Sequence, residues 1–128
     1  MRILTSGLCI SLLSCVDTED KEIVNYFNTP PNIRIDEPMD DASYVQFEDV
    51  LFVIYVEDNQ DPAEALTLEW SSDIQGTLMG PTTPSEDGTA FYPTANLDGG
   101  YHTILITVTD TEGLSSAQSI HVDVEGQS

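Results

Sequence analysis

One segment restricts the possible folds of this chain more than any other: residues 50–56 read VLFVIYV, an uninterrupted apolar run. Runs of β-branched and aromatic residues of this length are typical of buried strands. An acidic loop follows, in which Asn59 and Pro62 disfavour regular structure. Residues 66–70, LTLEW, then alternate apolar and polar side chains, which predicts a strand with one face towards solvent. Two such strands joined by a short loop indicate an all-β fold.

Short segments with strand character recur along the rest of the chain at the spacing of a sandwich. No segment keeps a helical period over a useful length, and residues 81–88 have the Pro, Thr, Ser and Gly content of a loop. An inward-facing Trp70 with carboxylates at the preceding turn is typical of an immunoglobulin-like sandwich. We therefore predict an all-β, immunoglobulin-like antiparallel β-sandwich of about seven strands. The segments with strand character are residues 32–36, 44–47, 50–58, 66–72, 75–79 (the weakest), 89–92, 102–109 and 117–124.

The charge balance is extreme: the formal net charge is -20, and only Arg2, Lys21 and Arg34 are basic. A chain of this charge repels nucleic acid and anionic membrane surfaces, so we exclude both as binding partners. It favours cations, basic surfaces, or a salty medium in which repulsion is screened over about 10 Å or less. Solubility alone is the competing explanation of the acidic composition.

The N-terminus has the features of a targeting segment. A short positive start, MR, precedes residues 3–13, which are mostly apolar and uncharged. This stretch is shorter than the roughly 20 residues of a membrane-spanning helix and has the proportions of a secretory signal peptide. Residues 12–15, LLSC, resemble the lipobox of bacterial lipoproteins. The resemblance implies cleavage after Ser14 and a diacylglyceryl group on Cys15. The alternative is an ordinary signal peptide with an incidental cysteine.

We therefore divide the chain into three parts: a lipoprotein signal peptide at residues 1–14, a lipid-anchored flexible acidic tether at residues 15–31, and the immunoglobulin-like sandwich at residues 32–125. Coil statistics give the tether a reach of roughly 20 Å. Removal of Cys9 with the signal and lipidation of Cys15 would leave the mature domain without a disulfide. The expected location is the bacterial cell envelope, at the outer membrane or cell surface, with membrane contact through the N-terminal lipid only.

Three stretches in the right order resemble PKD-like and other bacterial immunoglobulin-like surface domains. They are NTPPNIRI from residue 28, VEDNQDPAEALTLEWSSDIQGTL from residue 56, and GGYHTILITVTDTEG from residue 99. The aspartate- and glycine-rich turn that usually follows the Trp strand of PKD domains is replaced here by SSDIQGTL. A cadherin-like or a general immunoglobulin-like subfamily therefore stays open. The resemblance covers residues 28–124 and implies a domain that is presented at a surface.

Two residues are expected to have structural roles. Trp70 is in phase with Leu68, which directs its indole into the core rather than outward, where it could stack on a sugar. His102 begins a core strand, where such sandwiches often place a corner tyrosine, and one ring nitrogen would bond to upstream backbone. The alternative for His102 is a metal ligand. His121 is out of phase with the core and is expected to be exposed.

No catalytic constellation is expected. The mature chain would hold no cysteine nucleophile once Cys15 carries lipid, and neither histidine is expected beside a serine. The sequence also lacks a G-x-G-x-x-G motif and a P-loop. We therefore predict that the protein is not an enzyme.

Acidic residues gather in two loops that should meet at one pole of the sandwich. Asp58 continues the inward phase of residues 52–56, and Asp110 that of residues 104–108, so both carboxylates leave the core edge on the same side. Hard oxygens from several loops suit calcium, which takes roughly 6 to 8 of them. We predict a calcium site, and the competing explanation is that Asp and Asn are common in turns. The expected ligands are Asp58, Asp61, Asp110 and Glu112, with Asn32 as a possible helper and Glu64 and Asn28 at the same pole.

We predict a non-catalytic cell-envelope lipoprotein that presents one immunoglobulin-like module for protein interaction or adhesion, with calcium as the one cofactor considered. The alternative is a calcium-dependent carbohydrate-binding module, in which the acidic pole holds both ion and sugar. An outward aromatic cluster near that pole would favour a glycan, whereas a flat apolar sheet face would favour an envelope protein as partner. Expected on the outer faces, in support of a protein partner, are Leu51, Val53, Tyr55 and Leu105.

Overall fold

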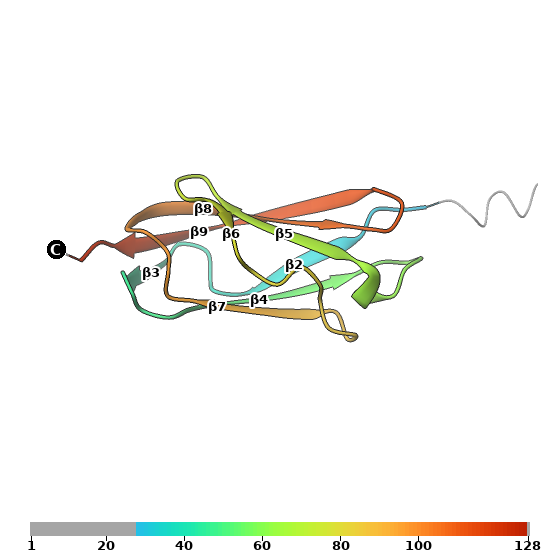
Figure 1. Cartoon of the computed structure of the whole chain (residues 1–128), viewed down its shortest axis with the longest axis horizontal. Coiled ribbons are helices and arrows are strands. Elements are labelled where there is room, and N and C mark those ends of the chain that lie inside the picture. Colours follow the sequence, from blue (N-terminus) through green and yellow to red (C-terminus); the bar gives the residue numbers. More distant parts are fainter. Residues whose placement is uncertain (1–27, 128) are drawn as a thin grey trace, which may run out of the picture.

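The computed structural model describes residues 28–127, which form two β-sheets packed face to face (Figure 1). The smaller sheet has the strand order β2-β4-β7, and the larger has the order β3-β9-β8-β5-β6. The predicted β-sandwich is confirmed, with eight strands in the described residues where about seven were expected. Cys15, the signal peptide and residues 16–27 of the tether lie outside the described residues. The elements are β2 (Asn32–Glu37), β3 (Ala42–Val45), β4 (Val50–Glu57), a 3-10 turn (Ala63–Ala65), β5 (Thr67–Ser72), β6 (Gly76–Leu78), β7 (Thr89–Thr94), β8 (Gly100–Thr109) and β9 (Ser115–Glu125).

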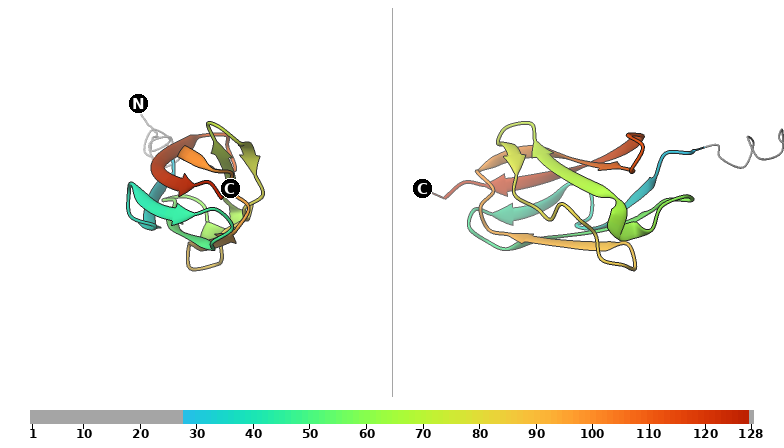
Figure 2. Two further views of the ribbon diagram at one scale, coloured as in Figure 1. Left: turned by 90° about the vertical axis from the view of Figure 1, so that its left-hand side faces the viewer. Right: turned by 45° about the vertical axis from the view of Figure 1, so that its right-hand side comes forward.

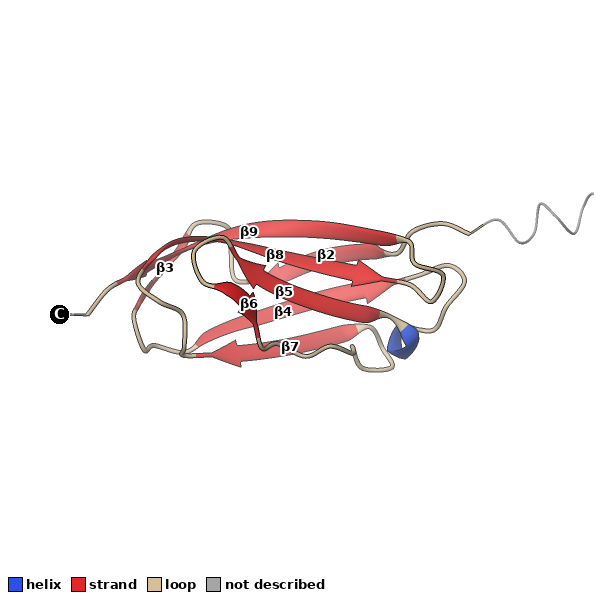
Figure 3. Cartoon of the chain, turned by 45° about the horizontal axis from the view of Figure 1, so that its top comes forward, coloured by secondary structure: helices blue, strands red, loops and turns tan. Residues whose placement is uncertain are grey.

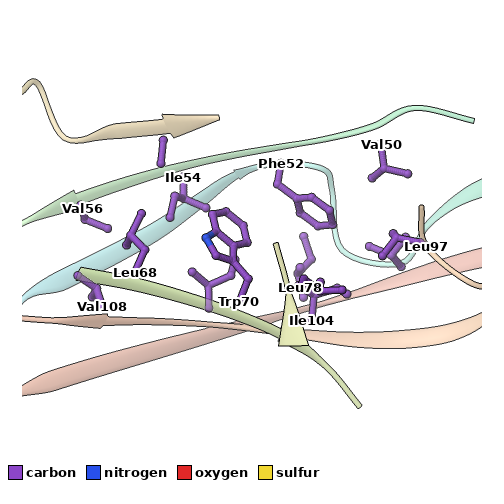
Figure 4. Packing of buried hydrophobic residues seen from close by; sticks show 14 of the residues in the cluster. Val50, Phe52, Ile54, Val56, Leu68, Trp70, Leu78, Leu97, Ile104 and Val108 are labelled. Carbon is purple, nitrogen blue, oxygen red and sulfur yellow. The ribbon is translucent and has the colours of Figure 1, made fainter. Parts of the chain in front are cut away.

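Strand β4 is the central strand of the smaller sheet, and its alternation fills one half of the core. Every second side chain, from Val50 to Val56, is buried, while the residues between them are exposed or half-buried on the outer face. The facing sheet contributes inward residues of β5 and β8 (Figure 4), and also those of β9. Burial of a large apolar side chain stabilises a fold by about 1.5–3 kcal/mol. The buried core residues of the larger sheet are Leu68, Trp70, Leu78, Ile104, Ile106, Val108, Ile120, Val122 and Val124.

Trp70 lies at the centre of this core and is 3% exposed. Its indole ring packs edge-on against Phe52 and Tyr92, with centroids 6.0 and 5.1 Å away. The indole N–H donates a hydrogen bond of 2.8 Å to the carbonyl of Pro81, so the polar atom of the ring is satisfied inside the sandwich. Gly80 is required beside it, because a Cβ there would lie 2.8 Å from the indole.

Strand β7 continues through Pro93 to Thr94, whereas the sequence predicted that this strand would end before Pro93. The reason is its place at the edge of the sheet. The N–H of Val56 on β4 donates towards the β7 side, to the carbonyl of Gly88, so even-numbered residues of β4 form the bonds with β7. Pro93 pairs with Leu51 and therefore directs its nitrogen away from β4, where no ladder bond is lost.

The first two described strands are divided between the two sheets. Strand β2 pairs antiparallel with β4, and β3 crosses to the other sheet and pairs parallel with β9. The parallel pair spans only Ala42–Val45 against the last residues of β9. Strand β8, in contrast, pairs with β9 along its full length.

The sandwich is elongated, and the two ends of the described chain lie at opposite poles (Figures 1 and 2). The β4–β5 loop and the β8–β9 loop lie at the pole where the chain runs into β2 (Figure 3). We call residues 28–29, 58–64 and 110–114 together the acidic pole. No helix in the part of the chain that the structure describes is long and apolar enough to cross a membrane.

Candidate metal centre at the acidic pole

Three carboxylates converge at the acidic pole. Asp58 follows the last residue of β4, Asp61 lies in the loop that follows, and Asp110 directly follows β8. One oxygen from each lies within 4.8 Å of the others. The strand phases that bury β4 and β8 place the first and third of these residues at the same end of the core, and the turn after Asp58 adds the second.

Asp58 holds its own turn with one oxygen and leaves the other free. Its Oδ2 accepts hydrogen bonds from the backbone N–H groups of Gln60 and Asp61, at 2.9 and 2.8 Å. Its Oδ1 is buried and has no hydrogen-bond partner among the described residues. A buried carboxylate oxygen without a partner is costly, so this atom is a natural ligand position for a cation.

Asp110 is 6% exposed, yet its environment favours the ionised form. Its Oδ1 accepts the backbone N–H groups of Glu112 and Leu114, both at 2.9 Å, and its Oδ2 accepts the side-chain amide of Asn28 at 2.9 Å. Burial alone would raise the pKa of Asp110, but the Asn28 amide and the backbone N–H groups outweigh it and lower the pKa. The carboxylate is therefore negatively charged at neutral pH.

Asp61 joins the two loops. Its Oδ2 accepts the backbone N–H and the hydroxyl of Thr111, at 3.0 and 2.8 Å. The start of the described chain is held by the same loops, because Thr29 donates its N–H and hydroxyl to Gln60 at 3.3 Å. The Asn59 amide donates in turn to the Thr29 hydroxyl at 3.3 Å. The pole is thus built from three segments that are distant in sequence.

No basic side chain compensates this charge within residues 28–127. Arg34 is the one Lys or Arg residue there, and its guanidinium is paired with Asp36 at 2.6 Å and stacked over Tyr55 at 4.9 Å from the ring centroid. A bound cation would relieve the repulsion between carboxylates this close together. The oxygens present fit a hard cation such as calcium, which accepts irregular oxygen cages completed by backbone carbonyls and water.

The structure brings together Asp58, Asp61 and Asp110 but not the fourth expected ligand. Glu112 is exposed, and it contributes its backbone N–H to Asp110 rather than its carboxylate to the group. Asn32 is exposed on β2, and Asn28 makes the amide contact instead. The proximity of Asn28 could be inferred from its place before β2, but its bond to Asp110 depends on a side-chain rotamer.

His102 is fully buried, and both ring nitrogens have partners. Nε2 lies 2.7 Å from the carbonyl of Asp98, which accepts only, so the proton of the neutral ring is on Nε2 and Nδ1 accepts from Ser72 Oγ at 2.7 Å. The expectation that no serine lies beside a histidine was therefore wrong. The register of β5 against β8 places Ser72 opposite Ile104, close to His102. Since Ser72 is itself only 5% exposed, the pair has no access to a substrate.

A second cluster, at the β2–β3 crossover, was not predicted. Asp40, Asp41 and His121 offer ligand atoms within 4.8 Å of one another, but the two aspartates are exposed. His121 Nδ1 lies 3.1 Å from Asp40 Oδ1, and its ring stacks on Tyr101 with centroids 5.5 Å apart. The Tyr101 hydroxyl donates to Asp41, which raises the pKa of Tyr101 to about 12. Sequence periodicity contains no signal for this cluster, because it depends on the parallel β3–β9 pairing.

Comparison with known proteins identifies the fold. No model of a protein family matches the chain, and no curated protein matches its sequence. The fibronectin(III)-like modules of Clostridium thermocellum CbhA superpose with a TM-score of 0.59 at 14% identity, over 76% of this chain and 47% of that one. A chimeric titin Z1Z2 gives 0.53 at 15% identity, over 79% and 99%. The titin M3 domain gives 0.50 at 25% identity, over 76% and 99%.

The chain thus spans about half the length of the CbhA structure and nearly all of the titin structures. These neighbours are immunoglobulin-like and fibronectin-III-like modules. They confirm the predicted immunoglobulin-like class of the sandwich.

Proposed function

We propose that this protein is a non-catalytic immunoglobulin-like interaction module, that its acidic pole binds calcium, and that lipid on Cys15 holds it at a bacterial cell envelope. The single observation that carries the calcium site is the Asp58 carboxylate. Its Oδ1 is buried without a hydrogen-bond partner in the described chain, and the group lies within 4.8 Å of the carboxylates of Asp61 and Asp110. A hard cation is the ligand that would satisfy this atom and offset the clustered charge.

Calcium fits this pole better than magnesium does. The three carboxylates come from two loops and already accept bonds from backbone N–H groups, which limits how regularly they can surround a small ion. Calcium tolerates such irregular geometry, whereas magnesium demands a near-ideal octahedron and loses water reluctantly. The lowered pKa of Asp110 keeps that ligand ionised and ready to bind a metal at neutral pH.

Thermal unfolding of the protein in millimolar calcium, in magnesium and in chelator, at matched ionic strength, tests the site. A ligand that binds only the folded state stabilises it by about 2.7 kcal/mol at a hundredfold excess over Kd. We expect a higher midpoint in calcium, a smaller rise in magnesium, and no calcium shift in Asp110→Asn. Glu69→Gln is the control, because Glu69 is exposed on β5 opposite Thr107. Equal midpoints in all three buffers would leave these aspartates as turn formers only.

The outer surface supports a protein partner rather than a glycan. Trp70, the aromatic ring best suited to stack on a sugar, is inside the core. The outer face of the smaller sheet carries exposed Leu51 and Phe91, with half-buried Val53 opposite Phe91. An apolar sheet face of this kind is typical of protein interaction surfaces. The Ser72–His102 pair, sealed in the core, offers no catalytic group that a substrate could reach, which supports a non-enzymatic role.

The lipid anchor rests on the LLSC sequence at residues 12–15, which follows an apolar segment. It would place the acidic module at a membrane surface without any membrane contact by the sandwich. Calcium binding and anchoring can be tested separately, because the proposed calcium ligands are Asp58, Asp61 and Asp110, whereas the proposed lipid is on Cys15.

A further inference from the structure

Strand β9 has an outer edge that is only partly covered. Of its 11 residues, the four from Val122 to Glu125 pair with β3. On the same side, residues 115–120 have no strand partner within the part of the chain that the structure describes. Unpaired edges of this kind offer backbone N–H and C=O groups to any extended chain that approaches them.

The backbone groups of this edge can be assigned to sides. The N–H of His121 donates to Asp40 Oδ1 and its carbonyl accepts the N–H of Asp41, both at 2.8 Å, so both groups of His121 point towards the β3 side. In an antiparallel ladder the groups of alternate residues point the same way. Ser119 and Ala117 therefore direct their N–H and C=O groups to the open side of β9.

A groove of about 580 Å³ lies along this edge. Met39 and Asp40, which precede β3, lie at one end of the groove. The groove therefore continues the line of β3 along β9. Half-buried Ile33 and Ile35 of β2 form the opposite wall. Arg34, which lies between them, pairs with Tyr55 and directs its backbone groups to β4, so the backbone groups of Ile33 and Ile35 point away from β4. The groove is lined by Ile33, Arg34, Ile35, Asp36, Pro38, Met39, Asp40, Gln118, Ser119, Ile120 and His121.

The negative charge around the groove favours a positively charged binding segment. Residues 28–127 contain 19 acidic residues and one Arg, and that Arg34 is already paired with Asp36. Asp40 lines the groove, and Asp41 lies next to it. A second copy of this chain would bring a charge of the same sign, and the tether at residues 16–27, with four acids and one Lys, is also acidic. Electrostatic repulsion therefore disfavours a second copy or the tether in the groove, whereas a basic segment is attracted.

We propose that the open edge of β9 binds an extended, lysine- or arginine-containing segment of a partner protein by strand addition, in line with β3. The inference rests on the proposed role as an interaction module but not on calcium. The segment would pair with the backbone of Ala117 and Ser119. Its apolar side chains would contact Ile33, Ile35 and the 81% exposed Met39, and its basic side chains would lie by Asp40.

A fluorescent octapeptide that alternates lysine and valine is the probe, and its binding to the full-length chain in detergent is measured by fluorescence anisotropy. The control peptide replaces each lysine by glutamate. We expect the lysine peptide to bind, and the glutamate peptide to bind at least about tenfold more weakly, which is a difference of about 1.4 kcal/mol. Equal binding of both peptides, or no binding of the lysine peptide, overturns the proposal.

Two proline variants separate strand addition from general charge attraction. Ser119→Pro removes an outward N–H from the open edge and leaves the bonds to β8 in place, so we expect a loss of about tenfold or more in affinity. Thr77→Pro places a proline on β6, the opposite edge strand of the same sheet, and should bind the peptide like the parent chain. Unchanged binding by Ser119→Pro overturns the proposal. Thermal unfolding of both variants confirms that each still folds.

The remaining outcomes are also decisive. Repeating the titration with calcium and with chelator distinguishes this groove from the acidic pole, because the peptide should bind in both. A calcium-dependent midpoint without peptide binding overturns the groove alone. If sedimentation shows that the parent chain is a dimer and Ser119→Pro a monomer, the occupant is a second copy, and the proposal of a basic partner is wrong.

Discussion

The side-chain amide of Asn28 donates a hydrogen bond of 2.9 Å to Oδ2 of Asp110, 82 positions later in the chain. This bond fastens the segment that leads into β2 to the β8–β9 loop. Thr29 is held at the same time by the β4–β5 loop through Gln60. Both loops of the acidic pole therefore hold the segment that leads into β2.

Acid should destabilise the domain through Asp110. Its pKa in the folded state is lowered, so the ionised group contributes stability that is present above the unfolded value of about 3.9 and is lost as the pH falls through the folded pKa. The measurement is urea unfolding in the presence of chelator. Below about pH 4, we expect the urea midpoint of Asp110→Asn to depend less on pH than that of the parent does. Glu69→Gln should keep the dependence of the parent. An Asp110→Asn curve as steep as the parent would contradict this account.

Asp58→Asn should separate calcium binding from intrinsic stability. The side-chain oxygen of the asparagine can still accept the N–H groups of Gln60 and Asp61. Its NH₂ group would replace the unpartnered Oδ1 and donate to a neighbouring carboxylate. In chelator we expect a thermal midpoint equal to or above that of the parent, because one of three repelling charges is gone. The calcium shift should fall. Asp58→Ala, which loses the turn bonds as well, should be less stable in both buffers. A full calcium shift in Asp58→Asn would argue against the site.

Trp70→Ala should cost about 3–5 kcal/mol of unfolding free energy, as truncation of large buried aromatics does in other cores. The loss combines the cavity between Phe52 and Tyr92 with the unpaired carbonyl of Pro81. Urea unfolding followed by circular dichroism measures it. Leu105→Ala, on the outer face of β8, is the matched control and should cost far less. A Trp70→Ala midpoint close to that of the parent would mean that the core does not depend on this ring.

Tyr101 should resist ionisation in alkali. Its hydrogen bond to Asp41 raises its pKa to about 12, so the folded state binds this proton more tightly than the unfolded state does, and stability falls as the pH rises from about 10 towards 12. Ultraviolet titration of the phenolate band should show a late-titrating tyrosine that is absent in Tyr101→Phe. Asp41→Asn should move this step to lower pH. The control is Glu112→Gln, at the other pole, which should leave the titration step of Tyr101 unchanged. Overlapping titration curves for Asp41→Asn and the parent would rule out the coupling of Tyr101 to Asp41.

Cys15 should carry lipid. Mass spectrometry of the mature N-terminus should detect a diacylglyceryl group on Cys15 and no signal peptide, and the protein should fractionate with membranes. Cys15→Ala should remove the modification and release the chain from the membrane fraction. The control is Cys9→Ala, since Cys9 would leave with the signal. An intact Met1 or an unmodified Cys15 would refute the anchor.

The candidate site was predictable to the extent that it follows from strand phase. The alternation that buries Phe52 to Val56 also places Asp58 at the core edge, and the same rule on β8 places Asp110 beside it. Periodicity does not determine which oxygen of Asp58 is left without a partner, because this depends on the local turn. It also cannot specify the register of β5 against β8, which brings Ser72 to His102, nor the parallel pairing of β3 that gathers Asp40, Asp41 and His121.

Pro93 makes the edge at β7 unlike the open edge of β9. An extended chain that approached β7 would meet a position with no N–H to offer, whereas the open stretch of β9 has its full set of backbone groups. A module with two equal edges can add to itself at both and grow into fibres, because each new copy presents the edge that the next requires. With Pro93 on β7, a chain of copies that joins β9 of one module to β7 of the next is disfavoured.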